Sequence, residues 1–436
     1  MKKLRVLIIA EAANPELTSV ALIGHSLSQA LGQVCDAHLV TESRNHDSLV
    51  KSGVSLDFFT SITNPAQRIA FRIAKVLRGG SSVGWTIHSA LTTLAYPLFE
   101  RKVWQHFSAR LERGEFDLVH RVTPLSPTTP SYLARRLRKI GVPLILGPLN
   151  GGIPWPAGFD HVRKAEREWL GYFRDLYRIL PGLRATRVCA SALVLASRHT
   201  YREVTAGEVG LENKAIWLPE NAIDPARFPE VDRAPLPMEP GAPLRVAFLG
   251  RLVPYKGADL LLEAALPLLR SGQIVLEIIG DGPQLPELRA SVAREGVVDR
   301  VEFPGWVAHE RVREHLSRAQ VFAFPSVREF GGGVVLEAMA LGLVPVVLDY
   351  GGPAELIPAG CGKVVPMGGR DEIVRSVRDA LLELLQSPAE LHAAGLRAQK
   401  HVRDHFTWEA KARQLLAVYH WTLDGNPLPK PDLGLE

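Results

Sequence analysis

Short apolar runs of strand length alternate with longer helical stretches along this chain. The runs are Val6–Ala10, Ala37–Val40, Leu118–His120, Leu144–Leu146 and Leu193–Ala196 in the first half, and Arg245–Leu249 and Val321–Phe324 in the second. Strands of a parallel sheet are covered on both faces by crossover helices, so they read as unbroken apolar runs. The pattern therefore predicts an α/β fold built on parallel sheets.

Length and composition favour more than one domain. The chain has 436 residues, of which 46% are hydrophobic, and a single core seldom extends beyond roughly 250–300 residues. Three cysteines, Cys35, Cys189 and Cys361, are far apart and odd in number, so we expect no disulfide framework and a reducing, cytoplasmic compartment. The start is interpreted as a first strand rather than a signal peptide, and no run of eighteen apolar residues predicts a membrane span.

The segment Pro325–Glu337, PSVREFGGGVVLE, sets Glu329 and Glu337 around three glycines. It lies between a predicted strand and a predicted helix that stops at Gly342. Gly331, Gly332 and Gly333 leave the backbone open, and the first N–H groups of a helix attract anions. We expect Glu337, in the first helical turn, to accept hydrogen bonds from vicinal hydroxyls such as those of a ribose, and Glu329 to lie nearer a sugar. The alternative is that Glu337 only caps the helix and the glycines only form a turn.

Two cations follow the strand that ends at Leu249. After Gly250 come Arg251 and Lys256, and then a helix predicted to begin near Gly257 or Ala258. Open α/β sheets bind ligands at the carboxyl ends of their strands, and a diphosphate would suit these side chains because charge-assisted contacts are strong. The alternative is a pair of solvated surface cations.

Taken in order, GRLVPYKG, IIGDGP, VEFPGWV, PSVREFGGGVVLEAMALG and LDYGGPAELI resemble the retaining glycosyltransferases of family four, which have the GT-B fold. The resemblance implies two Rossmann-like domains facing a central cleft, and transfer of a sugar from a UDP- or GDP-hexose without a metal or another cofactor. It also implies that Arg251 and Lys256 hold the diphosphate, that Glu337 takes the ribose, and that Glu329 lies by the sugar. The donor set is then Gly250, Arg251, Lys256, Trp306, Val307, Glu329, Phe330, Gly331, Gly332, Gly333, Val334 and Glu337, with Trp306 and Val307 flanking the base.

The resemblance also sets the expected domain boundaries. The N-terminal domain spans residues 1–225, a linker 226–243, and the nucleotide-sugar-binding domain 244–404. A helix at 405–422 is expected to cross back to the N-terminal domain, and the tail at 423–436 is expected to be frayed.

The N-terminal half departs from the family pattern at two places. The loop after the first strand, which contains Asn14, has no glycine where relatives carry a glycine pair. The segment FDLVHRVTP places His120 at the first of two family histidines and Val122 at the second. We count His120 as a catalytic candidate, with Arg121 as an acceptor-side alternative. A lone histidine at a strand end is equally often a structural, hydrogen-bonded one.

A further loop, LGPLNGGIPWPAGF, carries Asn150, Gly151 and Trp155. Together with Asn14 and Arg121 they form the acceptor-side set, because Asn150 could bond a hydroxyl and Trp155 could stack on a sugar. The alternative is a turn whose glycines only permit unusual backbone angles. The acceptor itself is unidentified and is a carbohydrate, a lipid-linked sugar or a small molecule.

A basic stretch lies beside apolar residues between Phe58 and Phe107. Its cations are Arg68, Arg72, Lys75 and Arg78, and an apolar run at Trp85–Phe99 follows. With a formal charge of +5, this permits peripheral contact with an anionic bilayer at the inner face of the membrane. The alternative is an ordinary core helix with solvated basic residues. The cations are not interleaved with stacking motifs, so we expect no nucleic-acid partner.

Two other functions fit the same residues less well. A nucleotide-sugar epimerase could share the fold and the donor site, and would turn over the donor without an acceptor. A decayed binding or scaffold protein would explain Val122, but the presence of Arg251, Lys256, Glu329 and Glu337 argues against it.

Overall fold

The computed structural model describes residues 3–64, 83–160, 182–206, 208–228 and 241–435. The chain divides into two compact units. Unit 1 takes Met1–Gly152, Arg163–Glu220 and Trp408–Leu435, and unit 2 takes Ile153–Val162 and Asn221–Thr407. The basic residues 68–78 and most of the expected linker at 226–243 lie outside the described residues.

Unit 1 is built on a parallel sheet with the strand order β3-β2-β1-β4-β5-β6-β7. Its strands are β1 (Arg5–Ala10), β2 (Asp36–Glu42), β3 (Phe59–Ile62), β4 (Leu118–Thr123), β5 (Leu144–Leu149), β6 (Ala192–Leu195) and β7 (Ala215–Trp217). In the register of the central strands, Ile8 of β1 lies between Leu39 of β2 and His120 of β4. The predicted apolar runs of the first half are therefore confirmed as strands.

Both faces of this sheet are covered by helices, which explains why β1 is apolar throughout. Val6 and Ile8 belong to one core cluster, with Leu415 of the last helix, and Leu7 and Ile9 belong to the other, with Phe99. The helices are α1 (Val20–Val34), α2 (His46–Lys51), α4 (Val83–Glu112), α5 (Ala134–Lys139), α7 (Leu183–Cys189), α8 (Arg198–Thr205) and α16 (Trp408–Leu423), with short 3-10 helices η1 (Ser43–Asn45) and η3 (Glu212–Lys214).

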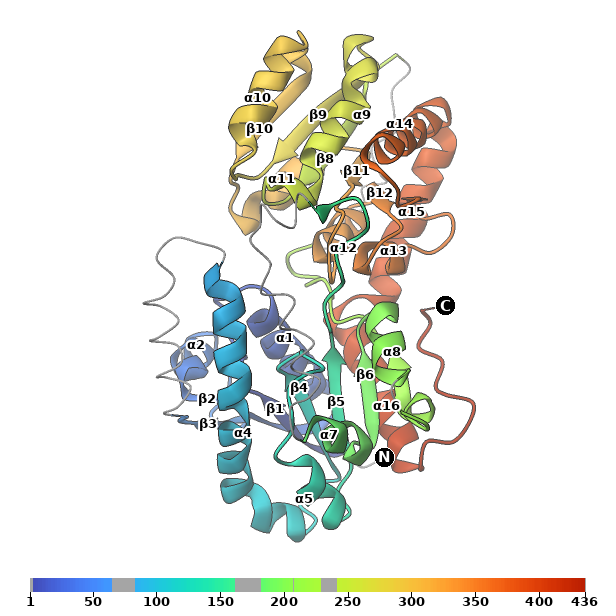
Figure 1. Cartoon of the computed structure of the whole chain (residues 1–436). Coiled ribbons are helices and arrows are strands. Elements are labelled where there is room, and N and C mark those ends of the chain that lie inside the picture. Colours follow the sequence, from blue (N-terminus) through green and yellow to red (C-terminus); the bar gives the residue numbers. More distant parts are fainter. Residues whose placement is uncertain (1–2, 65–82, 161–181, 207, 229–240, 436) are drawn as a thin grey trace. The chain divides into compact units, whose positions relative to one another are not determined.

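The C-terminal end of the chain belongs to unit 1. Helix α16 packs against α1, and Figure 1 shows this red helix among the blue and green elements of unit 1. We had expected the tail after it to be frayed, but its described residues are packed against unit 1. Asn426 Nδ2 donates to the Ser191 carbonyl at 2.8 Å, and Leu433 and Leu435 pack on the core. Apolar contacts with the core thus order a segment whose local sequence has no regular pattern.

Unit 2 has a second parallel sheet, with the order β10-β9-β8-β11-β12-β13. Its strands are β8 (Leu244–Leu249), β9 (Ile274–Ile279), β10 (Val301–Gly305), β11 (Val321–Phe324), β12 (Val344–Leu348) and β13 (Lys363–Val365). Its helices are α9 (Ala258–Arg270), α10 (Leu285–Arg294), α11 (Val312–Leu316), α12 (Gly333–Ala340), α13 (Gly352–Glu355), α14 (Arg370–Gln386) and α15 (Pro388–His405), with η4 (Pro254–Lys256), η5 (Val298–Arg300) and η6 (His309–Arg311).

The chain order of unit 2 reverses between β8 and β11, which are neighbours in the sheet. Val246 pairs with Val321 and Ala247 with Phe322, in parallel. The loops that follow the two strands therefore emerge side by side at the carboxyl edge, where ligands bind in sheets of this kind. In the part of the chain that the structure describes, no helix is both long and apolar enough to cross a membrane.

Candidate functional site

The two loops at the switch point of unit 2 are joined by an ion pair. Lys256, at the end of η4 after β8, pairs through Nζ with Oε2 of Glu329 after β11. Both side chains are 18% exposed, and the ammonium lies 5.3 Å from the centre of the Phe324 ring. The sequence candidates Lys256 and Glu329, 73 positions apart, are thus brought into direct contact.

Gly257 allows this approach of the two loops. Its φ is 78°, and a Cβ at this position would overlap the carbonyl oxygen of Pro325. Any other residue would push the loop after β8 away from the end of β11 and would carry an unfavourable left-handed backbone angle. The position of Lys256 therefore depends on the absence of a side chain at the next residue.

Helix α12 presents its N-terminus at the same edge. Its N-cap, Gly332, has a φ of 64°, and no side chain in the described part of the chain caps the helix. Gly331 and Gly333 add no side chain over the first turn, so this end keeps donors and partial positive charge for an anion. Val334 and Phe330 are half-buried beside them.

Glu337 lies one turn further along α12 than we expected. The helix begins at Gly333, so Glu337 is in its second turn and does not cap it. Its Oε1 bonds to Nε2 of His309 at 3.0 Å. Its Oε2 is buried and has no hydrogen-bond partner among the described residues. Because such an acceptor is costly to leave unpaired, a ligand hydroxyl or an ordered water is the expected partner.

The remaining donor candidates lie around this edge at different depths. Arg251 is exposed at the end of β8, just after Gly250. Trp306, after β10, is 76% exposed, while Val307 is half-buried. A large exposed indole offers apolar surface that a binding partner can cover.

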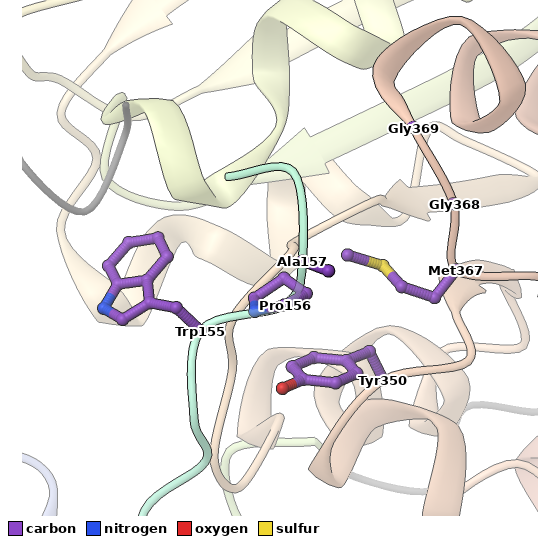
Figure 2. Close-up of a pocket in the computed structure, with 7 residues that line it drawn as sticks. All are labelled: Trp155, Pro156, Ala157, Tyr350, Met367, Gly368 and Gly369. Atoms are coloured by element: carbon purple, nitrogen blue, oxygen red, sulfur yellow. The ribbon is translucent and has the colours of Figure 1, made fainter. Parts of the chain in front are cut away.

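A pocket of about 540 Å³ lies in unit 2 beside the segment that carries Trp155. In Figure 2 the side chain of Met367 points towards Pro156 and Ala157, with the Tyr350 ring beside them. Hydrogen bonds from Tyr350 and Arg328 hold this segment. The Tyr350 hydroxyl donates to the Pro154 carbonyl at 2.7 Å, and Arg328 Nε donates to the Ile153 carbonyl at 3.0 Å. The Arg328 guanidinium also lies over the Trp155 ring, 4.8 Å from its centre.

His120, which we counted as a catalytic candidate, has both ring nitrogens hydrogen-bonded inside unit 1. Its side chain is fully buried. Because a carbonyl only accepts, Nε2–H donates to the Gly147 oxygen at 2.6 Å, and Nδ1 accepts from the Tyr419 hydroxyl, also at 2.6 Å. Burial lowers the pKa of His120 to about 4. This is the structural alternative that the sequence left open.

Arg121 is likewise part of a buried cluster rather than an open acceptor surface. It is 1% exposed, its Nη1 donates to the Thr129 carbonyl at 3.2 Å, and the same atom is 4.0 Å from Oε1 of the buried Glu100. Burial raises the pKa of Glu100. The pair links α4 to β4.

The other acceptor-side candidates in unit 1 are hydrogen-bonded to distant parts of the same unit. Asn14 is buried; its Nδ2 donates to Ser48 Oγ at 3.2 Å and its Oδ1 accepts from the Glu16 amide at 2.8 Å. Asn150 Nδ2 donates to Glu220 Oε1 at 2.7 Å. The Gly151 amide donates to Thr200 Oγ1 at 2.9 Å. Of the acceptor-side set, Trp155 alone falls in unit 2.

Comparison with known proteins places the chain in a family. The family model described as "Glycosyl transferases group 1" matches residues 243–387. A GDP-mannose-dependent alpha-(1-6)-phosphatidylinositol monomannoside mannosyltransferase of Mycolicibacterium smegmatis is 34% identical over 342 residues, covering 71% of this chain and 86% of that protein. The chain belongs to the group 1 glycosyltransferases. The family that the C-terminal motifs indicated is thereby confirmed.

Other glycosyltransferases match a smaller part. A 2-deoxystreptamine glucosyltransferase of Streptomyces kanamyceticus is 30% identical over 234 residues, so the match spans 50% of this chain and 58% of that enzyme. Among solved structures, the crystal structure of Anabaena HepE in complex with UDP covers 95% of this chain and 98% of HepE, with a TM-score of 0.59 and 16% identity. That likeness confirms the GT-B fold.

Two residues next to the Glu337 carboxylate were missed in the sequence. They are His309, which bonds Glu337, and Arg227, whose guanidinium contacts Nδ1 of His309. Arg227 is 82 positions before His309. The available signal was a polar histidine two positions after the VEFPGWV segment.

Proposed function

We propose that this chain is a retaining, metal-independent glycosyltransferase that moves a hexose from a UDP- or GDP-sugar to an acceptor hydroxyl. The observation that carries the proposal is the arrangement at the carboxyl edge of unit 2. Within the described residues, the Lys256–Glu329 pair occurs there together with a start of α12 that no side chain caps and with Oε2 of Glu337, which has no hydrogen-bond partner. A cation, anion-binding amides and a buried carboxylate oxygen match a diphosphate, a sugar and a ribose.

Departure of a nucleoside diphosphate puts negative charge on the leaving oxygen while the sugar becomes oxocarbenium-like. Fixed positive groups aimed at that oxygen stabilise the transition state more than the ground state. Lys256 and the first amides of α12 supply this charge, and exposed Arg251 adds a second cation. Each charge-assisted contact contributes about 1.5–3 kcal/mol.

Donor binding changes the partner of Lys256. In the structure the ammonium is paired with Glu329. When a diphosphate arrives, Lys256 turns to it, and Glu329 is released to accept hydrogen bonds from the sugar. The side chains are only partly exposed, so this exchange avoids leaving either charge unpaired in a poorly solvated site.

We further propose that the acceptor presents a hydroxyl on a polyhydroxylated ring. The names of two relatives include 2-deoxystreptamine and a phosphatidylinositol mannoside. In this chain, Trp155 and Tyr350 line the pocket of Figure 2 with aromatic side chains. The apolar face of a sugar or cyclitol stacks on such rings. Contact with a membrane through the basic stretch at residues 68–78 stays a prediction.

The test is turnover with a panel of nucleotide sugars and ring-polyol acceptors, followed by NMR of the product's anomeric centre. We expect one donor class to react with retention, and activity to be unchanged by a chelator. Lys256→Met should lower kcat/KM by about 10-fold to 100-fold. Lys363→Met is the matched control, because Lys363 forms an ion pair with Glu383 elsewhere in unit 2.

Other outcomes identify the other functions. Conversion of the donor to a different nucleotide sugar without an acceptor would indicate an epimerase. Donor binding without turnover in any mixture would indicate a decayed binding protein. An inverted product, or activity abolished by the chelator, would contradict the proposed mechanism while leaving the family assignment intact.

A further inference from the structure

His309 lies between an arginine and the carboxylate of Glu337. It is the first residue of η6, between β10 and α11, and its side chain is 38% exposed, against 16% for that of Glu337. Nε2 is 3.0 Å from Glu337 Oε1, and Nδ1 contacts the Arg227 guanidinium. All three residues belong to unit 2.

Arg227 is held in place by its own turn. Its amide donates to the Asp224 carbonyl at 3.0 Å, and the Ala226 amide donates to Asp224 Oδ1 at 2.9 Å. The preceding Ile223 amide donates to the Phe406 carbonyl at the end of α15, at 2.7 Å. The guanidinium therefore comes from an anchored segment rather than from a free loop end.

The contacts determine which nitrogen of His309 carries the proton. A guanidinium has only donors, so Nδ1 must accept from Arg227, and Nε2 must then carry the hydrogen that is donated to Glu337. The imidazole is neutral in this arrangement. Its N–H is directed at Oε1, so the buried Oε2 is the carboxylate oxygen that has no hydrogen-bond partner among the described residues.

We infer that His309 is a positioning residue for the donor, with Arg227 fixing its tautomer. It holds one oxygen of Glu337 so that the other faces the ribose hydroxyls. The inference rests on the proposed function, because it takes Glu337 as the ribose-binding group. A carboxylate that is already oriented loses less side-chain entropy on binding than one that is free to rotate.

A second histidine–carboxylate pair in the same unit provides the matched control. His315 of α11 lies with Nδ1 2.5 Å from Glu277 Oε1 of β9, and both side chains are about 12–13% exposed. This pair resembles the His309 pair in its chemistry and in the burial of its carboxylate, although His315 is more buried than His309. It joins α11 to β9 and does not involve Glu337.

The experiment compares a ribonucleoside diphosphate with its 2′,3′-dideoxy analogue by calorimetry, using UDP or GDP, whichever the wild type binds. The measured quantity is the Kd of the dideoxy analogue divided by the Kd of the ribonucleotide. For wild type we expect the ribonucleotide to bind at least about tenfold more tightly, as a hydrogen bond to a charged group implies. For Glu337→Ala the ratio should fall to about one.

The His309 variants separate positioning from general structural support. His309→Ala should lower the wild-type ratio by about threefold or more, and Arg227→Met should lower it too, because both disturb the orientation of Glu337. His309→Gln keeps an N–H donor near the Nε2 position and should retain most of the preference. His315→Ala should leave the ratio unchanged. Arg227→Met keeps the test decisive if His309→Ala does not fold.

The outcomes distinguish this inference from the proposed function. If wild type prefers the ribonucleotide and both His309→Ala and Arg227→Met keep the full preference, the positioning role is overturned and the ribose role of Glu337 stands. If wild type binds the two analogues equally, the ribose role of Glu337 is wrong and the inference falls with it. If no nucleoside diphosphate binds, the proposed function itself is contradicted.

Discussion

Replacing His120 by glutamine tests whether this histidine is structural. The side chain is fully buried in unit 1 between the Tyr419 hydroxyl and the Gly147 carbonyl. Glutamine has a donor and an acceptor for the same two partners but does not titrate near neutral pH. The variant should therefore fold at pH 7 and differ from wild type mainly in how its stability depends on pH.

The size of that difference follows from the pKa of His120, which burial lowers to about 4 from an ordinary value of 6.5. Between these values the unfolded chain binds a proton that the folded chain does not, so stability is lost as the pH falls from 6.5 towards 4. On lowering the pH from 7 to 4.5, this one group costs wild type about 2.5 kcal/mol. The glutamine variant lacks that loss.

Urea unfolding at the two pH values, followed by circular dichroism, measures the effect. Taking the difference between wild type and variant cancels the titration of other groups. Tyr419→Phe is a control that keeps the histidine; it should be less stable at pH 7 by about 1–3 kcal/mol, because a buried acceptor loses its donor, and should keep the wild-type pH dependence. Equal pH dependence in wild type and His120→Gln would refute the reasoning. A large loss of donor turnover in a fully stable His120→Gln would instead restore a catalytic role.

Two further changes test the loop geometry and a buried lysine. Gly257→Ala should destabilise unit 2 and weaken diphosphate binding, since its Cβ would overlap Pro325; Gly296→Ala, also left-handed at φ 68° but in open space, should cost only about 1 kcal/mol in thermal unfolding and should not affect binding. Lys411→Met should remove the rise of stability between pH 7 and 10.5, up to about 1.4 kcal/mol per pH unit, because burial lowers the pKa of Lys411 to about 7. Urea unfolding at pH 7.5 and 9.5 measures it, and an unchanged slope would contradict the burial argument.

The strands and the glycine loop were predictable because their signals are local. An unbroken apolar run such as Val321–Phe324 indicates a strand buried on both faces, and the reversal of chain order then brings its loop to that of β8. From the sequence, Lys256 and Glu329 could be expected to contact the same ligand but not each other. Their contact depends on the close approach of Gly257 to Pro325, which is a tertiary feature.

The errors concern residues whose role depends on distant parts of the chain. His120 lies near a strand end, so the sequence suggested that it could reach a ligand. Instead its Nδ1 accepts a hydrogen bond from the hydroxyl of Tyr419, which lies 299 positions later. Glu337 was placed one turn too early because three successive glycines leave the start of a helix undefined in sequence. No periodic pattern in the sequence could reveal the contact of Arg227 with His309, because it joins a turn to a 3-10 helix 82 positions later.

The central claim is that the carboxyl edge of unit 2 binds a nucleoside diphosphate, and calorimetric titration of wild type and Lys256→Met with UDP and GDP tests it most directly. We expect wild type to bind one of them, and Lys256→Met to bind it at least about tenfold more weakly, as the loss of one charge-assisted contact requires. Lys363→Met should bind as wild type does. Absence of binding to wild type, or equal affinity in Lys256→Met, would contradict the account.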